Sequence, residues 1–130
     1  MTSYPTDQVP SIRQVMMPRD TNAVGTIFGG VILAQIDLAA SIECHKSHQG
    51  KLVTVSMDKI DFKAPVLVGD LVSFFTSTNR IGRSSINVHV AVWAQRRFGG
   101  GDNDYVTEAE VTMVAVDEHF TPIPVGSATE

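Results

Sequence analysis

The sequence is poor in cysteine and in charge. Cys44 is the only cysteine among 130 residues, which excludes an intramolecular disulfide and a cysteine-rich zinc site. A secreted domain of this size more often carries paired cysteines, so we expect a cytoplasmic protein. Charged residues make up 18% of the chain and the formal net charge is −4. This acidic balance argues against a nucleic-acid partner, because a broad nucleic-acid-binding surface needs clustered Lys and Arg.

Targeting signals and long hydrophobic runs are also missing. Residues 1–14 contain no charged region followed by an apolar run, so we expect no signal peptide. The most apolar stretch, Ile27–Ile42, has 16 residues, fewer than the ~20 that a membrane span needs. It also contains Gln35, Asp37 and Ser41. We therefore interpret it as a buried helix and expect no membrane partner.

The rest of the chain predicts strands around this helix. We expect strands at 51–62, 71–80, 84–97 and 105–116, with clear alternation of apolar and polar residues at 51–62 and 84–97. The short, mixed segment 11–17 could form an edge strand, and the turns between the strands are short. The polar residues 1–10 predict a flexible N-terminal tail, and residues 11–130 predict a single domain. Short connections favour an antiparallel meander. The expected fold is therefore α+β, with a curved antiparallel sheet of about five to six strands wrapped around one long central helix.

The apolar content of the strands also suggests self-association. One helix is expected to shield only part of it, and we expect residues such as Trp93, Val106, Val111 and Met113 to exceed what it covers. A second copy of the chain, packed sheet beside sheet, would cover the remainder. The sequence thus favours a homodimer.

Asp37 is the first candidate for chemistry. It lies in the middle of the apolar helix, and no cation is at helical spacing from it. An unpaired buried carboxylate is costly, so such a residue is paired, protonated or functional. A purely structural role, on a narrow polar stripe of the helix with Gln35, is the alternative.

Gly29 and Gly30 open the same helix and form a second candidate. Backbone N–H groups at a helix N-terminus have no intrahelical partner and can polarise a carbonyl. Asp37 lies about two turns further along, ~10 Å from Gly30 at 1.5 Å per residue, so the two cannot act on one atom within one subunit. They could belong to sites that two subunits share, although a pair of glycines also permits close packing alone.

Two further groups give weaker signals. The turn Gly82, Arg83, Ser84 and Ser85 offers a guanidinium and two hydroxyls that suit a phosphate, or it is an ordinary hairpin turn. His45 and His48 follow the helix near Cys44, but a fourth metal ligand is missing, so we expect no metal and a solvated helix end.

Several motifs together resemble one known family. The segment MPRDTNAVGTIFGG at residues 17–30, followed by QID at 35–37, is similar to hot-dog-fold acyl-CoA thioesterases of the bacterial short- and broad-specificity type and the cytosolic acyl-CoA hydrolases. The likeness continues through Phe62, through 82–85 and through VAVD at 114–117, and covers about residues 12–125.

The resemblance implies the hot-dog fold and hydrolysis of an acyl-CoA thioester without a cofactor, by a dimer that often assembles into a trimer of dimers. It places the catalytic carboxylate at Asp37, the carbonyl-polarising amides around Gly29 and Gly30, and a polar site residue at Asn22. It places CoA contacts at 82–85 and, as a further candidate, at Lys63. Asp37 would act as general base or as nucleophile.

The sequence departs from the family at Thr26, at Val31 and at residues 38–40, where relatives usually carry an acid, Trp and a Gly pair. These departures affect the expected acyl chain length and not the reaction class. Two alternatives remain open: a non-catalytic acyl-CoA-binding or sensor protein on the same fold, and an acyl-thioester dehydratase.

Overall fold

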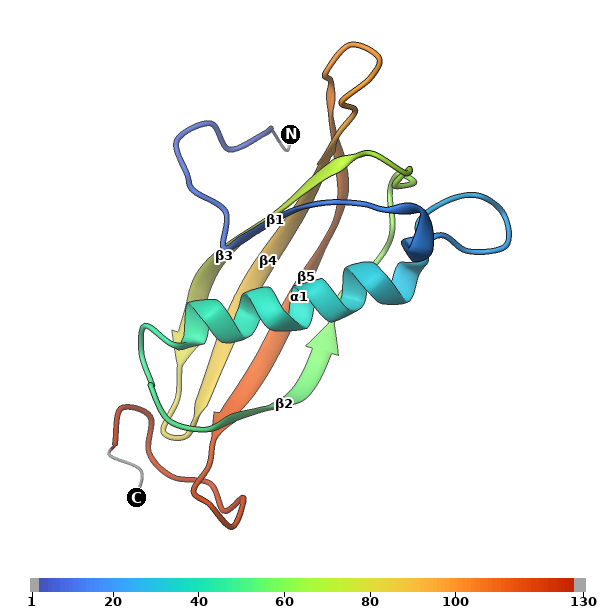
Figure 1. The fold of residues 1–130 in the computed structure, drawn as a ribbon. Helices are drawn as coiled ribbons and strands as arrows, with labels where there is room; N and C mark the ends of the chain where they lie inside the picture. The colour runs from blue at the N-terminus through green and yellow to red at the C-terminus, as the bar shows by residue number, and fades with distance from the viewer. Residues whose placement is uncertain (1–2, 128–130) are drawn as a thin grey trace.

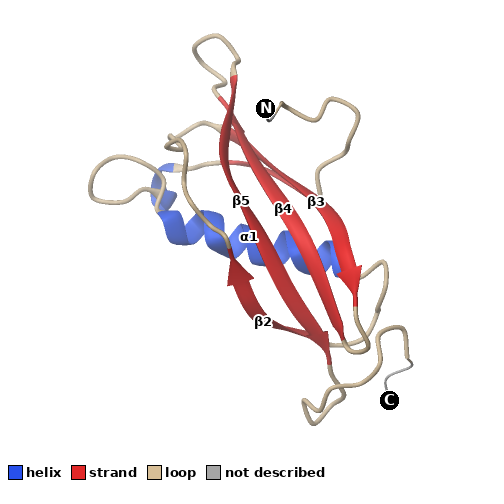
Figure 2. Ribbon diagram, turned by 180° about the vertical axis from the view of Figure 1, so that it is seen from behind, coloured by secondary structure: helices blue, strands red, loops and turns tan. Residues whose placement is uncertain are grey.

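The computed structural model describes residues 3–127 and contains one long α-helix that crosses the face of an antiparallel sheet (Figure 1). Its elements in chain order are β1 (Ile12–Val15), the short 3-10 helix η1 (Pro18–Asp20), α1 (Gly29–Cys44), β2 (Leu52–Asp58), β3 (Leu71–Ile81), β4 (Ser85–Gln95) and β5 (Asn103–Ala115). The five strands lie in the order β1-β3-β4-β5-β2, so β1 and β2 are the two edges. Figure 2 shows the opposite face of the sheet, which no helix of residues 3–127 covers. The predicted architecture is confirmed.

The core lies between α1 and the concave face of the sheet. β4 follows the expected period of two, because Ile86, Val88, Val90 and Val92 are fully buried while the residues between them up to Ala91 are partly exposed. These side chains form one cluster with the sheet-facing side of α1, which includes Ile32, Ile36, Ala39, Ala40 and Cys44. The predicted strand at 71–80 corresponds to β3 and that at 11–17 contains β1.

The edge strand β2 does not follow simple alternation. Its register against β5 shifts between Thr54 and Ser56, because Val55 is an extra residue that forms a β-bulge. Leu52 and Met57 pack against the core, but Val55 is 56% exposed. The alternation of apolar and polar residues in this segment predicts the strand, but the bulge interrupts the alternation of its faces at Val55.

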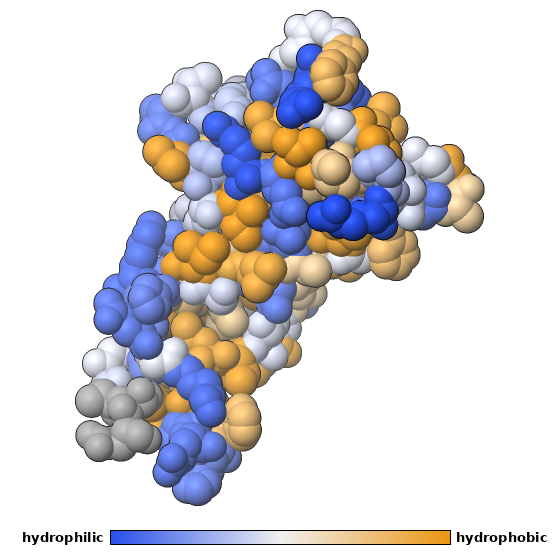
Figure 3. Space-filling model, in the orientation of Figure 1, coloured by the Kyte–Doolittle hydropathy of each residue, from blue (hydrophilic) through white to orange (hydrophobic). Residues whose placement is uncertain are grey.

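The apolar residues left exposed are not those that the sequence suggested. Val106, Val111 and Met113 are buried in the single chain, and Trp93 is 5% exposed. The first three belong to the core cluster that includes residues of α1, and the rings of Tyr4 and Tyr105 pack against Trp93. One part of the exposed apolar surface lies on α1 and the segments beside it, where Phe28, Leu38, Ile42, Val55 and Phe62 are exposed. Other large apolar side chains, such as Val9, Val24, Phe98 and Phe120, are exposed singly in loops and near the N-terminus. In the orientation of Figure 1, hydrophobic patches alternate with polar residues over this face (Figure 3).

The N-terminal segment contacts the outer face of the sheet. The Tyr4 ring packs edge-on against Phe75 and Trp93, with ring centroids 5.6 and 5.5 Å apart, and Arg13 donates a hydrogen bond to its hydroxyl. Residues 1–2 of the predicted tail lie outside the described residues, and the flexibility of the tail stays a prediction. Within residues 3–127, no helix has the length and apolar character to cross a membrane.

Candidate active site

The loop before α1 determines where the helix begins. Asn22 closes this loop, because its side-chain amide donates to Thr26 Oγ1 and its Oδ1 accepts the N–H groups of Val24 and Thr26. The N–H of Phe28 then donates to Asp20 O, and α1 starts at Gly29. Asn22 thus orients the helix N-terminus, and its predicted role at the reacting atoms stays a prediction.

The first turn of α1 has no side-chain cap. Phe28 occupies the N-cap position without a side-chain hydrogen bond, so the N–H groups of Gly29 and Gly30 face outward as donors at the positive end of the helix dipole. A Cβ at Gly30 would lie 2.5 Å from the Phe28 ring. Glycine at 30 therefore lets that aromatic ring fold over the helix start.

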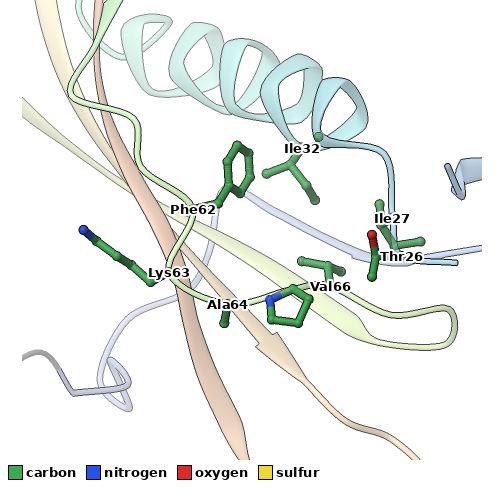
Figure 4. Close-up of a pocket in the computed structure, with 9 residues that line it drawn as sticks. Thr26, Ile27, Ile32, Phe62, Lys63, Ala64 and Val66 are labelled. Carbon is green, nitrogen blue, oxygen red and sulfur yellow. The ribbon is translucent and has the colours of Figure 1, made fainter. Parts of the chain in front are cut away.

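A cavity of about 350 Å³ lies beside this helix start (Figure 4). Its wall consists of Thr26, Ile27, Gly29, Ile32, Phe62, Lys63, Ala64, Pro65 and Val66, which come from the helix start and from the loop after β2. Most of these side chains are apolar, so the cavity suits an apolar chain. The Lys63 side chain extends away from the other lining side chains (Figure 4), which places its ammonium outside the cavity.

Asp37 lies on the side of α1 that faces β2. It is partly exposed, and its Oδ1 accepts a 2.5 Å hydrogen bond from the hydroxyl of Thr54. The bulge at Val55 follows directly, next to the unpaired edge of β2. The sequence did not reveal Thr54 as a partner. Its one signal is a polar residue on the strand that follows the helix.

The turn 82–85 connects β3 to β4. The Gly82 N–H donates to Ser85 O, and Ser84 O accepts from the N–H of Ala115. Arg83 is exposed and its guanidinium has no hydrogen bond or ion pair with residues 3–127. Arg83 therefore presents a positive charge that no described side chain pairs with and that could bind a phosphate.

The residues after α1 differ from expectation. His45 is exposed, but His48 is 1% exposed, so the predicted solvated helix end is wrong at His48. The chain returns over this end of the helix and covers it: the N–H of Gly126 donates to His48 Nδ1. Within residues 3–127, no three His, Cys, Asp or Glu side chains form a metal-binding cluster.

Two other buried groups lie near the end of α1. Glu43, which has no signal in the sequence pattern, accepts hydrogen bonds from Thr76 and Thr78 and pairs with Lys46. Burial, with the charge of Glu43 added, raises the pKa of the Cys44 thiol to about 11. Cys44 is therefore protonated and unreactive at neutral pH.

The structure brings only some of the predicted site residues together within one chain. Asn22, Gly29 and Gly30 share the start of α1, and Asp37 lies two turns along it. The turn at Arg83 is joined through Val125 and Gly126 to His48, just beyond the other end of the helix. A carboxylate and free helix amides are groups that can hydrolyse an activated acyl group, and an exposed guanidinium can bind an anionic part of a ligand. One chain does not place these groups around a single point.

Comparison with known proteins places this arrangement in a defined class. Residues 24–97 match the model of the Thioesterase superfamily. The acyl-CoA thioester hydrolase YciA of Salmonella typhimurium is 36% identical over 115 residues, which cover 87% of this chain and 86% of the relative.

Solved structures of the class superpose closely. The hexameric hot-dog-fold thioesterase of Campylobacter jejuni shares 43% identity, covers 89% of both chains and gives a TM-score of 0.84. The hexameric thioesterase of Yersinia pestis shares 37% identity, covers 96% of this chain and 100% of its own, and gives 0.87.

These similarities define first the fold and then the family. A central helix wrapped by a curved antiparallel sheet, at this structural similarity, is a hot-dog fold. Because the family model covers more than half of the chain, the protein belongs to the Thioesterase superfamily. The resemblance seen in the sequence is confirmed.

Proposed function

We propose that this protein hydrolyses acyl-CoA thioesters to a free carboxylic acid and CoA, with Asp37 as the catalytic carboxylate. The observation that carries the proposal is the placement of Asp37. It is a carboxylate oriented by Thr54 on an otherwise apolar helix face, in a chain that is 36% identical to a protein named acyl-CoA thioester hydrolase. No cofactor is needed, because a thioester is already activated toward attack.

The reaction needs one base and one carbonyl-polarising group. As general base, the Asp37 carboxylate takes a proton from water, and the hydroxide attacks the thioester carbonyl carbon. The N–H groups of Gly29 and Gly30 stabilise the oxyanion that forms. Collapse of this tetrahedral oxyanion breaks the C–S bond, and the CoA thiolate takes the proton that Asp37 removed from water. Alternatively Asp37 attacks directly, expels the thiolate and forms a mixed anhydride that water hydrolyses.

A second copy of the chain would complete this site. A 16-residue helix is about 24 Å long, and Asp37 is eight residues beyond Gly29 on it. A two-fold partner that joins at the free edge of β2 and covers Leu38, Ile42 and Val55 would run its helix antiparallel to α1. The helix start of one subunit would then approach Asp37 of the other. The hexameric relatives support a trimer of such dimers.

The same arrangement assigns the CoA contacts. Gly82, Arg83, Ser84 and Ser85 would hold the phosphates, with Lys63 as an additional cation whose ammonium lies outside the cavity. The cavity beside Gly29 would take part of the substrate's apolar chain. The protein as a whole carries a net charge of −4, so an anionic substrate depends on these local cations. A cytoplasmic location stays a prediction.

The decisive experiment is a thiol-release assay. Purified protein should release free thiol from an acyl-CoA, and folded Asp37→Ala should lose at least about a thousandfold in kcat. A screen across acyl chain lengths would define the substrate. Asp102→Ala, which removes an exposed carboxylate from the β4–β5 turn, is the matched control and should keep full activity.

Other outcomes would replace the proposal. Full turnover by a folded Asp37→Ala variant would exclude Asp37 as the catalytic group. Tight CoA binding without thiol release would indicate a non-catalytic acyl-CoA-binding protein. Addition of water to an enoyl-CoA without thiol release would indicate a dehydratase.

A further inference from the structure

The C-terminal segment after β5 folds back onto the end of the molecule that carries the 82–85 turn (Figure 1). Val116 forms a bridge with Pro122 and donates its N–H to Lys51 O. Ile123 then donates its N–H to Ala115 O, which directs the chain toward the loop after α1. The segment therefore lies between two parts of the molecule that are distant in sequence.

A tight turn at Pro124–Ser127 makes the contact with both parts. The Ser127 N–H donates to Pro124 O, and Gly126, the third residue, has φ +86°. A hydrogen-bonded turn with a positive φ at its third residue only is a type II turn. Its two central N–H groups point to different partners: Val125 donates to Arg83 O at 2.7 Å, and Gly126 donates to His48 Nδ1 at 3.0 Å.

His48 is the fixed end of this link. A backbone N–H can only donate, so Nδ1 accepts and the ring proton of the neutral imidazole lies on Nε2. Nε2 is buried and has no hydrogen-bond partner among residues 3–127. A buried donor without a partner lowers stability, and an apolar side chain of similar size would avoid that cost. The contribution of His48 at this position is therefore its role as acceptor for the Gly126 N–H.

Arg83 is the other end of the link. Its carbonyl oxygen is held by Val125, while its exposed guanidinium has no partner among the described residues. A long, unrestrained side chain loses conformational freedom when it binds a ligand, and fixing its backbone beforehand reduces that loss. The hydrogen bond from Val125 to the Arg83 carbonyl thus favours binding of a phosphate by the Arg83 guanidinium.

We propose that His48 is a positioning residue for CoA: it holds the turn at Gly126, the turn holds the backbone of Arg83, and Arg83 meets the CoA phosphates in a fixed place. This inference rests on the proposed function, because it takes the CoA contact at Arg83 from there. It adds a residue 35 positions away in sequence that touches neither the substrate nor the guanidinium.

The test compares CoA with pantetheine, which lacks the nucleotide phosphates. Dissociation constants are measured by calorimetry, with displacement of CoA where pantetheine binds weakly. His48→Leu removes the acceptor, and we expect it to weaken CoA binding about three- to tenfold and to leave pantetheine binding unchanged. His48→Asn should bind CoA as the wild type does, because its Oδ1 stands where Nδ1 stands in histidine. Hydrogen exchange of the Gly126 amide should accelerate in His48→Leu alone.

The variant Arg83→Ala distinguishes the CoA contact at Arg83 from the positioning role of His48. If Arg83→Ala leaves CoA binding unchanged, the CoA contact is wrong and the role of His48 is overturned with it. If Arg83→Ala weakens CoA binding but His48→Leu does not, only the role of His48 is overturned. Equal weakening of CoA and pantetheine by His48→Leu would also overturn it, since that indicates a general structural effect.

A second variant covers the case in which His48→Leu does not fold. Val125→Pro removes the N–H that Arg83 O accepts, and proline is favoured at the second position of a type II turn. We expect the same three- to tenfold loss for CoA and no change for pantetheine. Unchanged CoA binding by this variant would overturn the proposed link.

Discussion

The hydroxyl of Thr54 donates a 2.5 Å hydrogen bond to Oδ1 of Asp37, which joins the edge strand β2 to the middle of α1. The bond leaves Oδ2 of the carboxylate without a hydrogen bond from residues 3–127. It also fixes which oxygen faces β2. Because the β-bulge at Val55 follows directly, the backbone of β2 is adapted to bring this hydroxyl to the helix.

Removal of the Thr54 hydroxyl should slow the reaction without abolishing it. Thr54→Val keeps the shape of the side chain and loses the bond, and hydrogen bonds to charged groups contribute about 1.5–3 kcal/mol. We expect kcat to fall about tenfold to a hundredfold with little change in KM, because the carboxylate is still present but less well oriented. Thr54→Ser keeps the hydroxyl and should stay near wild-type activity. An unchanged kcat in Thr54→Val would show that the bond has no role in catalysis.

The amide of Gly29 can be removed without disturbing the helix. Proline is favoured at the first helical position, and Phe28 has the extended ψ of 129° that suits a residue before proline. Gly29→Pro should therefore retain its thermal stability and lose about a hundredfold in kcat, as expected for an oxyanion-stabilising donor. Gly29→Ala keeps the N–H, and its Cβ would lie 3.8 Å from Phe62, an ordinary contact. Equal activity of the two variants would exclude this amide as the donor.

Co-expression of two inactive variants tests whether subunits share the site. A dimer of one Asp37→Ala chain and one Gly29→Pro chain has one site in which both groups are intact. Random pairing should restore about a quarter of wild-type activity, because half of the dimers are mixed and each has one working site. Each variant expressed alone is the control. If each site draws both groups from one chain, the mixture stays inactive.

The spacing of apolar residues predicts the strand β4 and the helix α1, because each buries a regular face of its own residues. β4 shows the strand alternation because one face meets α1 and the other does not, and α1 is apolar because the sheet curls around it. Asp37 was found for the same reason, as the exception in an apolar helix. The strand β4, the helix α1 and the exceptional position of Asp37 can each be recognised from the spacing of apolar residues along the chain.

Contacts between distant segments were not predictable in this way. His48 is buried by Gly126, 78 residues further along the chain, and its own neighbours in sequence are exposed or partly exposed. The bulge at Val55 and the cover that Tyr4 gives Trp93 are likewise consequences of tertiary packing. The partner of Asp37 depends on that bulge, which explains why Thr54 was missed.

The buried carboxylate of Glu43 should make stability depend on pH. Burial alone raises its pKa, but the bonds from Lys46, Thr78 and Thr76 outweigh this effect and hold the pKa below the usual 4.5. Because the pKa of Glu43 is lower in the folded state, its ionised carboxylate stabilises the protein above about pH 4.5. The protein loses this stabilisation as the pH falls through the folded-state pKa of Glu43. Glu43→Gln should cost about 2 kcal/mol in urea unfolding at pH 7, and less at pH 3.5.

The matched control for Glu43 is Glu118→Gln. The Glu118 side chain is 69% exposed, so this variant should unfold as the wild type does at both pH values. An equal deficit of Glu43→Gln at pH 7 and pH 3.5 would mean that the charge of Glu43 does not contribute to stability.

The single cysteine should resist alkylation in the folded protein. Cys44 is fully buried, and its thiol pKa of about 11 compares with 9.0 for an unperturbed thiol. At pH 8 this lowers the thiolate fraction about a hundredfold, and burial slows the reagent further. Iodoacetamide should modify the protein completely in urea and hardly at all without it. Rapid labelling of the native protein would show that the end of α1 opens.

Tyr4 should protect the only tryptophan of the chain. Its ring lies edge-on to Phe75 and Trp93, and such aromatic pairs contribute about 0.5–1.5 kcal/mol each. Tyr4→Ala should therefore shift Trp93 emission to longer wavelength, increase its quenching by acrylamide and lower stability by about 1–2 kcal/mol. Tyr4→Phe keeps the ring and loses only the hydroxyl that Arg13 contacts, so its spectrum should match the wild type. An unchanged spectrum in Tyr4→Ala would mean that the N-terminal segment does not cover Trp93 in solution, as a freely mobile tail would not.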